Sequence, residues 1–268
     1  MALVRAIVRA DPVSVSGLVS RQPDLALARF AVGATRQAGE DYFLGEIEHY
    51  VYGGDSALHV AAAAFEVGVV RQLVDGGALV CAVNRRGAQP LHYAVDGIPG
   101  SARWDPAAQR ETVLCLIELG ADPNAADRNG TTPLHRAVRN RCAAAVGALL
   151  DVGADPHADN GSGSTAMQLA RWTTGRPGSG SAPAKAQQAE IVQLLQAKKQ
   201  NIRNVIIHAV HMGYPVAGLM SALSYFDAYR SDRMPTNLIQ AQRDYFGAHT
   251  YQRIDETGSF HTQWENRP

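Results

Sequence analysis

The sequence predicts an all-α fold: a solenoid of stacked helical hairpins followed by a short helical tail segment. The first observation is a four-residue phrase that occurs four times. Its copies are Ser56–His59, Gln89–His92, Thr132–His135 and Thr165–Gln168. Their third residues are apolar, lie 33, 43 and 33 residues apart, and are expected to be buried in register; they are Leu58, Leu91, Leu134 and Met167. The second observation is that two apolar helical patterns follow each copy in turn, which indicates one hairpin of helices per repeat.

Each repeat also carries signals for where its helices begin and end. A glycine stands five residues before the last residue of each phrase, where it favours a tight turn. These glycines are Gly54, Gly87, Gly130 and Gly163. A serine or threonine then caps the helix in three copies, and Pro90 and Pro133 occupy the first helical turn, where a missing N–H costs nothing. Glycines such as Gly120 and Gly153 end the second helices.

With Thr-Pro-Leu-His at 132–135 and this period, residues 53–199 resemble the ankyrin repeat family. The resemblance implies about four repeats and a surface that binds a protein partner. Residues 1–52 match the repeat only loosely, and we expect them to form divergent capping helices. Their apolar residues group into three short helical patterns. These contain Leu3, Val4, Ile7 and Val8; Val15, Leu18 and Val19; and Leu25, Leu27 and Phe30.

Two insertions interrupt the period, near residues 96–109 and 175–187. Insertions in solenoids fall on loops of one edge and often carry partner specificity. An aromatic residue in a loop is a typical binding anchor, so Trp104 is the candidate interaction residue of the first insertion. The alternative is that both insertions are tolerated surface loops.

The three phrase histidines, His59, His92 and His135, could be mistaken for metal ligands. Their spacing follows the repeat, which would place them about 10 Å apart, too far to share one ion at about 2 Å each. In the ankyrin family this histidine typically hydrogen-bonds within the loop framework, and we expect that role here. The sequence predicts no metal site, no catalytic residues and no dinucleotide fingerprint in the repeats.

Composition narrows the partners and the compartment. The chain has 25 basic and 25 acidic residues and a formal net charge of zero, which argues against nucleic acid or an anionic membrane as the partner. No run approaches eighteen apolar residues, and Arg5 and Arg9 interrupt the first apolar stretch. Three irregularly spaced cysteines are typical of free thiols. We therefore expect a cytoplasmic protein.

After Lys199 the repeat phrases stop, and residues 200–268 have a different pattern. Three helical patterns are expected, at about 202–210, 216–230 and 235–247, before an extended tail at 249–264. The run Gln240-Ala-Gln-Arg-Asp-Tyr-Phe-Gly-Ala-His-Thr250 closely resembles the extreme C-terminus of 6-phosphogluconate dehydrogenase, and the resemblance covers about 202–265.

In that family the enzyme is a dimer and this tail threads into the neighbouring subunit. The resemblance implies that Arg243 and His249 bind the substrate phosphate, a contact that guanidinium and imidazole groups suit. The family's nucleotide-binding domain and its acid–base lysine and glutamate have no counterpart here. We therefore expect no catalysis by this chain alone and no cofactor, with NADP entering only if a partner dehydrogenase subunit completes the site.

Three functions stay open at this point. The leading one is protein–protein interaction through the repeats. The second is an accessory subunit that donates its tail to an NADP-dependent decarboxylating 6-phosphogluconate dehydrogenase of the pentose phosphate pathway. In the third, the tail is a purely structural cap over the end of the solenoid.

Overall fold

The structure is a computed structural model that describes residues 1–172 and 181–211, with side chains for 1–171 and 181–197. The chain divides into two compact units, Met1–Lys198 and Lys199–Pro268. The first unit is the helical array. Of the second unit, only the backbone at the end of one helix is described. The helices expected beyond residue 211 and the expected extended tail lie outside the described residues.

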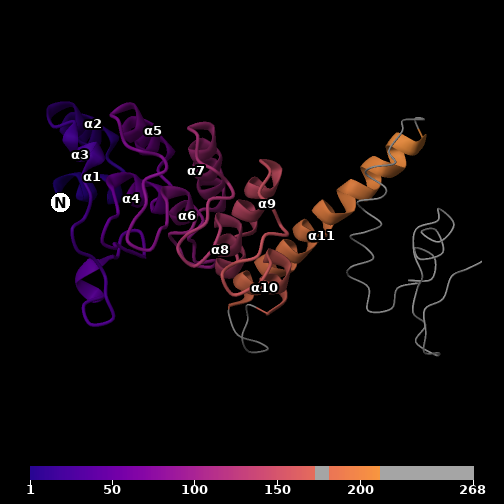
Figure 1. The fold of residues 1–268 in the computed structure, drawn as a ribbon. Coiled ribbons are helices and arrows are strands. Elements are labelled where there is room, and N and C mark those ends of the chain that lie inside the picture. The colour runs from indigo at the N-terminus through magenta and orange to yellow at the C-terminus, as the bar shows by residue number, and fades with distance from the viewer. Residues whose placement is uncertain (173–180, 212–268) are drawn as a thin grey trace, which may run out of the picture. The chain divides into compact units, whose positions relative to one another are not determined.

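The array is a row of paired helices that lie side by side from the N-terminus onward (Figure 1). It begins with α1 (Ala2–Val8), α2 (Pro12–Arg21) and the short α3 (Asp24–Leu27). The inner helices of the repeats are α4 (Ala57–Ala63), α6 (Pro90–Ala94), α8 (Pro133–Asn140) and α10 (Ala166–Trp172). The outer helices that follow them are α5 (Val67–Asp75), α7 (Pro106–Glu118), α9 (Ala143–Asp151) and α11 (Ala182–His211). Inner helices stack on inner helices and outer on outer, as repeat architectures require.

The repeat register places the phrase leucines in the core. Leu58, Leu91 and Leu134 are at most 1% exposed, in successive inner helices. The expectation that Met167 is buried in the same way is wrong, because this side chain is only half-buried. Its helix, α10, packs against α8 on one side, and no further inner helix follows it among the described residues.

The phrase glycines adopt the left-handed backbone conformation that the turn requires. Gly54, Gly87, Gly130 and Gly163 have φ angles of 88°, 77°, 67° and 71°. At Gly54, Gly87 and Gly130 the neighbouring loop also approaches so closely that a Cβ would lie within 3.0 Å of its backbone. The glycines therefore serve both the turn and the stacking of one loop on the next.

Residues 1–52 contain the three expected helical segments, but the last stops at Leu27, short of Phe30. Residues beyond it depart from the all-helical expectation. A 3₁₀ turn, η1 (Glu40–Tyr42), leads into an antiparallel hairpin of β1 (Phe43–Leu44) and β2 (His49–Tyr50), with Phe43 opposite Tyr50. The paired residues Phe43 and Tyr50 are aromatic and Gly45 lies between the two strands, and these residue types favour strands and turns over helix.

The first insertion has a definite place. The inner and outer helices of the first and third repeats are joined by three and two residues, Ala64–Glu66 and Arg141–Cys142. In the second repeat, the loop Val95–Asp105 joins α6 to α7, and α7 itself has 13 residues against nine in α5 and α9. Of the second insertion, residues 173–180 lie outside the described residues, and 182–187 belong to the start of α11.

Helix α11 runs without a break from Ala182 to His211, through the expected boundary between the repeats and the tail. Its first part packs on the last described hairpins: Ile191 and Leu195 are buried, and Gln187 Oε1 accepts the Ala143 N–H at 3.0 Å. The helix expected from residue 202 is thus the continuation of the last outer helix. No proline or glycine lies between residues 184 and 211 to end it.

Two further observations concern the described residues as a whole. Within them, no helix combines the length and the apolar character that crossing a bilayer demands. The cysteines are free thiols, with Cys81 exposed and Cys115 and Cys142 buried. Burial raises the pKa of the Cys142 thiol to about 12, so it stays protonated at neutral pH.

Candidate functional site

The three phrase histidines, here called the histidine ladder (His59, His92, His135), are structural, as the sequence predicts. In each, Nδ1 accepts the backbone N–H of the residue three positions earlier, at 3.1–3.2 Å. In each, Nε2 then donates to a backbone carbonyl of the following loop, at 3.0–3.1 Å. Each ring therefore joins the start of its own inner helix to the next repeat. Among the described side chains, no three His, Cys, Asp or Glu gather as metal ligands.

Desolvation dominates the electrostatics of the ladder. It lowers the pKa of His59 to about 4, and it also lowers the pKa of His92 and His135 below the ordinary histidine value. A neutral ring with one N–H donor and one bare nitrogen matches the observed pattern of one donated and one accepted bond. Both ring nitrogens of each ladder histidine are thus used to hold the loops, and neither is left to act on a substrate.

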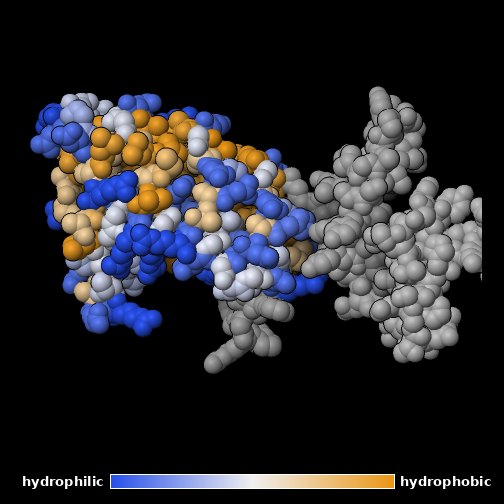
Figure 2. Space-filling view, viewed as in Figure 1, coloured by the Kyte–Doolittle hydropathy of each residue, from blue (hydrophilic) through white to orange (hydrophobic). Residues whose placement is uncertain are grey.

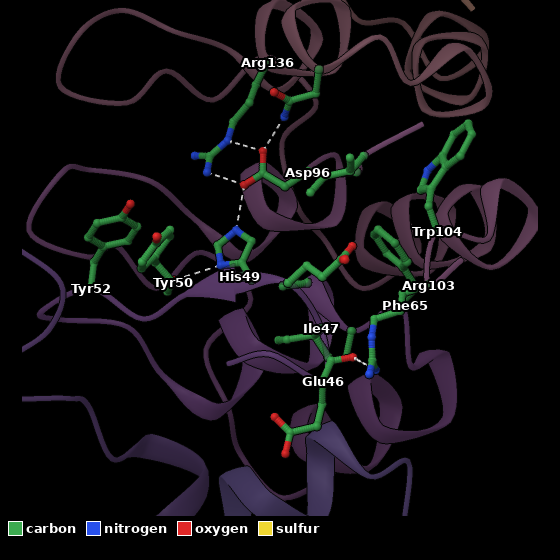
Figure 3. Close-up of a pocket in the computed structure, with 16 residues that line it drawn as sticks. Glu46, Ile47, His49, Tyr50, Tyr52, Phe65, Asp96, Arg103, Trp104 and Arg136 are labelled. Atoms are coloured by element: carbon green, nitrogen blue, oxygen red, sulfur yellow. Dashed lines mark hydrogen bonds and ion pairs between the residues drawn. The ribbon is translucent and has the colours of Figure 1, made fainter. Parts of the chain in front are cut away.

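A pocket of about 300 Å³ lies between the N-terminal hairpin and the first insertion loop (Figure 3). The hairpin residues 46–50 form one wall, and the insertion loop residues 96–98 and 103–104 form another. The floor comes from inner helices: the end of α4 supplies residues 63–65, and α8 supplies Arg136 and Asn140. Aromatic side chains line it from several segments. They are Tyr50, Tyr52, Phe65 and Trp104.

One carboxylate organises the interior of this pocket. Asp96 follows α6 and accepts bonds from His49 Nε2 (2.8 Å), from Asn140 Nδ2 (2.6 Å) and from two nitrogens of Arg136, with Nε at 2.6 Å. These four residues, the Asp96 cluster, come from the hairpin, the second repeat and the third repeat. The Asp96, His49 and Arg136 side chains are only 14%, 13% and 21% exposed. The cluster therefore ties three segments together at one point.

The neighbours of Asp96 in the cluster stabilise its negative charge. Burial alone would raise the pKa of Asp96, but the Arg136 guanidinium and the bond from His49 outweigh it and hold the pKa well below its usual range. The second ring nitrogen of His49, Nδ1, lies 2.8 Å from the Tyr50 carbonyl oxygen. Both His49 ring nitrogens therefore face oxygen atoms, one of the Asp96 carboxylate and one of the backbone.

The hairpin and the insertion loop also contact each other outside the cluster. Ser101 Oγ donates to the Glu48 carboxylate at 2.5 Å, and the Arg103 guanidinium donates to the Glu46 carbonyl. These contacts cross more than fifty residues of sequence. They link the hairpin to the insertion loop a second time, beside the Asp96 cluster.

Trp104, the candidate from the sequence, lines this pocket and is half-buried. Its Nε1 donates to Gln109 Oε1 at 3.0 Å, and its ring packs directly on Gly97, where a Cβ would lie 2.6 Å from Nε1. Asp96, His49 and Arg136 were not identifiable from the sequence, because they are 40 or more residues apart and belong to no motif. Arg243 and His249 lie outside the described residues, so their phosphate-binding role stays a prediction.

Comparisons with known proteins divide the chain in the same way. Family models match an ankyrin repeat at residues 53–85, ankyrin repeats (many copies) at 116–170, and the 6-phosphogluconate dehydrogenase, C-terminal domain, at 181–264. The chain thus carries ankyrin repeats followed by a 6-phosphogluconate dehydrogenase C-terminal domain. Ankyrin repeats are a scaffold for protein interaction in general.

The curated relatives include 6-phosphogluconate dehydrogenases, and each match covers less than a third of this chain. Over 72 residues it is 53% identical to 6-phosphogluconate dehydrogenase, decarboxylating, of Escherichia coli (strain K12), which is 27% of this chain and 15% of that protein. It is 51% identical over 75 residues to the decarboxylating 1 enzyme of Oryza sativa subsp. japonica, 28% of this chain and 16% of that one. The Synechococcus elongatus enzyme is 61% identical over 62 residues, 23% and 13% of the two chains. The chain thus spans about a seventh of the length of these relatives.

Proposed function

We propose that the array is a protein-binding module and that its contact surface is centred on the pocket between the hairpin and the insertion loop. The observation that carries this proposal is that the hairpin and the first insertion loop, neither of which belongs to the regular repeat, line one pocket together with several aromatic side chains. Within it, polar groups of the Asp96 cluster are already bonded to one another, whereas Ile98 and Tyr50 at its edge are 55% and 41% exposed. Exposed apolar and aromatic groups around a preformed pocket suit the anchor residue of a protein partner.

The test uses variants of the full chain matched for exposure. Ile98→Asp places a charge at the edge of the pocket, and Leu79→Asp places one at a residue that is 54% exposed and does not line the pocket. A partner is captured from extracts of the producing cells, purified, and titrated against each variant. Ile98→Asp and Trp104→Ala should each weaken binding about tenfold or more, and Leu79→Asp should leave it unchanged. Equal binding by all variants would place the contact surface elsewhere.

The three free thiols favour a reducing compartment, and we place the module in the cytoplasm on that ground.

A second candidate function rests on the dehydrogenase-like end of the chain. An identity of about half over the last quarter supports the proposal that this segment docks on a 6-phosphogluconate dehydrogenase subunit and supplies Arg243 and His249 to its phosphate site. Because the segments for nucleotide binding and acid–base chemistry have no counterpart here, the purified chain should not reduce NADP with 6-phosphogluconate.

The corresponding test is complementation. The E. coli enzyme, shortened by the segment that this chain matches, is co-expressed with the full chain, and NADP reduction is measured on the co-purified material. Recovered activity that Arg243→Ala lowers, and that the array variant Arg110→Ala does not, would support tail donation. If the two proteins never associate, the segment is left with the role of a structural cap.

A further inference from the structure

We propose that the partner of the array presents an acidic polypeptide segment, rich in Asp and Glu, that lies across four arginines at one edge of the repeats. This inference rests on the proposed protein-binding function and adds the chemical class of the partner. The four residues, here called the arginine ridge, are all exposed. They are Arg29, Arg85, Arg86 and Arg128.

The ridge is continuous because neighbouring loops are bonded through their backbones. The Arg128 N–H donates to the Arg86 carbonyl at 3.0 Å, and the Arg85 N–H donates to the Gly53 carbonyl at 2.9 Å. At Gly87 the loops are so close that a Cβ would lie 2.9 Å from Arg128 Cγ. The arginines therefore belong to one surface and not to separate projecting loops.

In two of the three loops, side chains fix the backbone that carries Arg85, Arg86 and Arg128. Asn84 Oδ1 accepts the Arg86 N–H at 2.8 Å and the Ala88 N–H at 3.1 Å. In the next loop, Asp127 Oδ1 accepts two backbone N–H groups in the same way, at 2.8 and 3.0 Å. Because the backbone of these loops is already fixed, binding a partner should cost little additional loss of conformational entropy there.

Three of the four guanidinium groups are also held by contacts with neighbouring residues. Arg86 lies over the Tyr52 ring at 3.9 Å from its centroid. Arg29 donates to the Val83 carbonyl at 2.7 Å, and Arg85 donates to the Ala34 carbonyl. None of these supports is a carboxylate, so each contact orients the arginine and leaves its charge uncompensated.

The positive charge of the ridge is local. The ion pairs of the described residues involve Asp96, Glu118 and Asp151, and none includes a ridge arginine. Asp127, the carboxylate on the same loops, uses one oxygen for backbone bonds. Since the whole chain has a formal net charge of zero, the basic excess here is offset elsewhere. Figure 2 shows strongly hydrophilic side chains gathered over the loops beside α4 and α6.

The ridge adjoins the pocket, and this continuity favours a polypeptide. Tyr52 both lines the pocket and supports Arg86, so a chain that lies on the ridge can continue into the pocket with an apolar residue. A nucleic acid would offer phosphates along its whole length and would need a wider basic face than four arginines on a neutral protein. An acidic segment with an apolar neighbour matches both surfaces.

The experiment uses the full chain and a defined probe: a fluorescein-labelled twelve-residue peptide of alternating Glu and Ser that ends in Leu-Phe. Its control is the same peptide with Gln in place of Glu. Fluorescence anisotropy is measured at low and at physiological salt. The double variant Arg86→Gln/Arg128→Gln is compared with Arg71→Gln/Arg110→Gln, a matched pair of arginines whose ion pairs lie on exposed parts of the outer helices.

We expect the acidic peptide to bind more tightly than the Gln peptide, with an affinity that falls as salt rises. The ridge variant should bind the acidic peptide at least about tenfold more weakly, and the matched variant should bind as the wild type does. Charge reversal, Arg86→Glu/Arg128→Glu, should transfer the preference to a peptide with Lys in place of Glu.

Other outcomes would overturn the inference. Equal affinity for the acidic and Gln peptides would do so, as would equal losses in the two double variants. Tight binding of a twelve-nucleotide single-stranded DNA that displaces the peptide would show a general anion site instead. If a captured partner responds to Ile98→Asp but not to the ridge variant, the protein-binding function stands and the acidic partner class fails.

Discussion

The histidine ladder and the Asp96 cluster are both networks of buried polar groups, yet they are assembled differently. In the ladder, each ring makes the same two bonds, one within its own repeat and one to the next loop. In the cluster, groups from the hairpin, the second repeat and the third repeat meet once around a single carboxylate. The ladder pairs neutral groups with backbone, and the cluster pairs charges with one another.

The difference shows how one place on a repeat protein can acquire a surface that the other repeats lack. Bonds that recur in every repeat stabilise the stack without distinguishing one place along it from another. The cluster exists only where the hairpin and the insertion loop reach the same inner helices, and there it forms a pocket. In this molecule the stacked repeats, here called the regular part, form the scaffold, and the hairpin and the insertion loop form the candidate site.

The largest expected effect is a loss of packing in the regular part. Leu134→Ala removes a side chain that is 1% exposed and should lower the free energy of unfolding by about 2–5 kcal/mol. Leu79→Ala, at a residue that is 54% exposed, should cost less than about 0.5 kcal/mol. Chemical denaturation of the full chain measures both. A cost below about 1 kcal/mol at Leu134 would mean that the register is wrong.

The second prediction concerns the pH dependence of the ladder. The folded-state pKa of His59 is lowered to about 4, below its unfolded value, so its contribution is complete above about pH 6.5 and is lost as pH falls towards 4. His59 alone should then cost about 2 kcal/mol of stability between pH 7 and pH 5. The lowered pKa values of His92 and His135 act in the same direction.

A natural control for the ladder exists in the fourth repeat. There Gln168 takes the histidine position, and its Oε1 accepts the Thr165 N–H at 2.7 Å. His59→Gln should therefore fold and should flatten the decline in stability between pH 7 and pH 5, as measured by urea denaturation at each pH. A variant whose pH dependence equals that of the wild type would remove His59 from this role.

The third prediction breaks the cluster. Asp96→Asn leaves the Arg136 guanidinium, 21% exposed, without its carboxylate, and should cost about 1–3 kcal/mol of stability. The hairpin should also exchange its amide hydrogens faster, because His49 loses its charged partner. Glu118→Gln breaks an ion pair whose side chains are 50% and 63% exposed, and should cost at most about 1 kcal/mol. If both substitutions cost the same, burial of the Asp96 cluster would add nothing to its contribution to stability.

The smallest expected effect lies in the contacts between the hairpin and the insertion loop outside the Asp96 cluster. Ser101→Ala removes the bond to Glu48 and should cost about 0.5–1.5 kcal/mol at most. Its clearer readout is faster proteolysis within the loop Val95–Asp105, while global stability hardly changes. Unchanged proteolysis would show that the Asp96 cluster alone holds the loop in place.

Much of the regular part could be predicted residue by residue. The turn glycines, the inner-helix leucines and the backbone role of the histidines all follow from local patterns that recur with a fixed period. The fourth copy was the exception: Met167 is only half-buried, because burial depends on a neighbour that the phrase itself does not encode. The end of the repeats expected at residue 199 stays a prediction, and what the sequence pattern did not indicate is that α11 continues through that residue.

The period, the helix signals, the ankyrin repeats and the dehydrogenase-like end of the chain can be recognised from the sequence alone, because each depends on residues that are close together in it. The hairpin 43–50, and its meeting with the insertion loop over α4 and α8, became known only from the folded structure. Only the tertiary structure, too, gathered the arginine ridge from three loops. The physical reason is that pairs such as His49–Asp96 and Asp96–Arg136 span 47 and 40 residues of chain. No local propensity encodes such a contact, and stacking of the repeats has to bring its partners together.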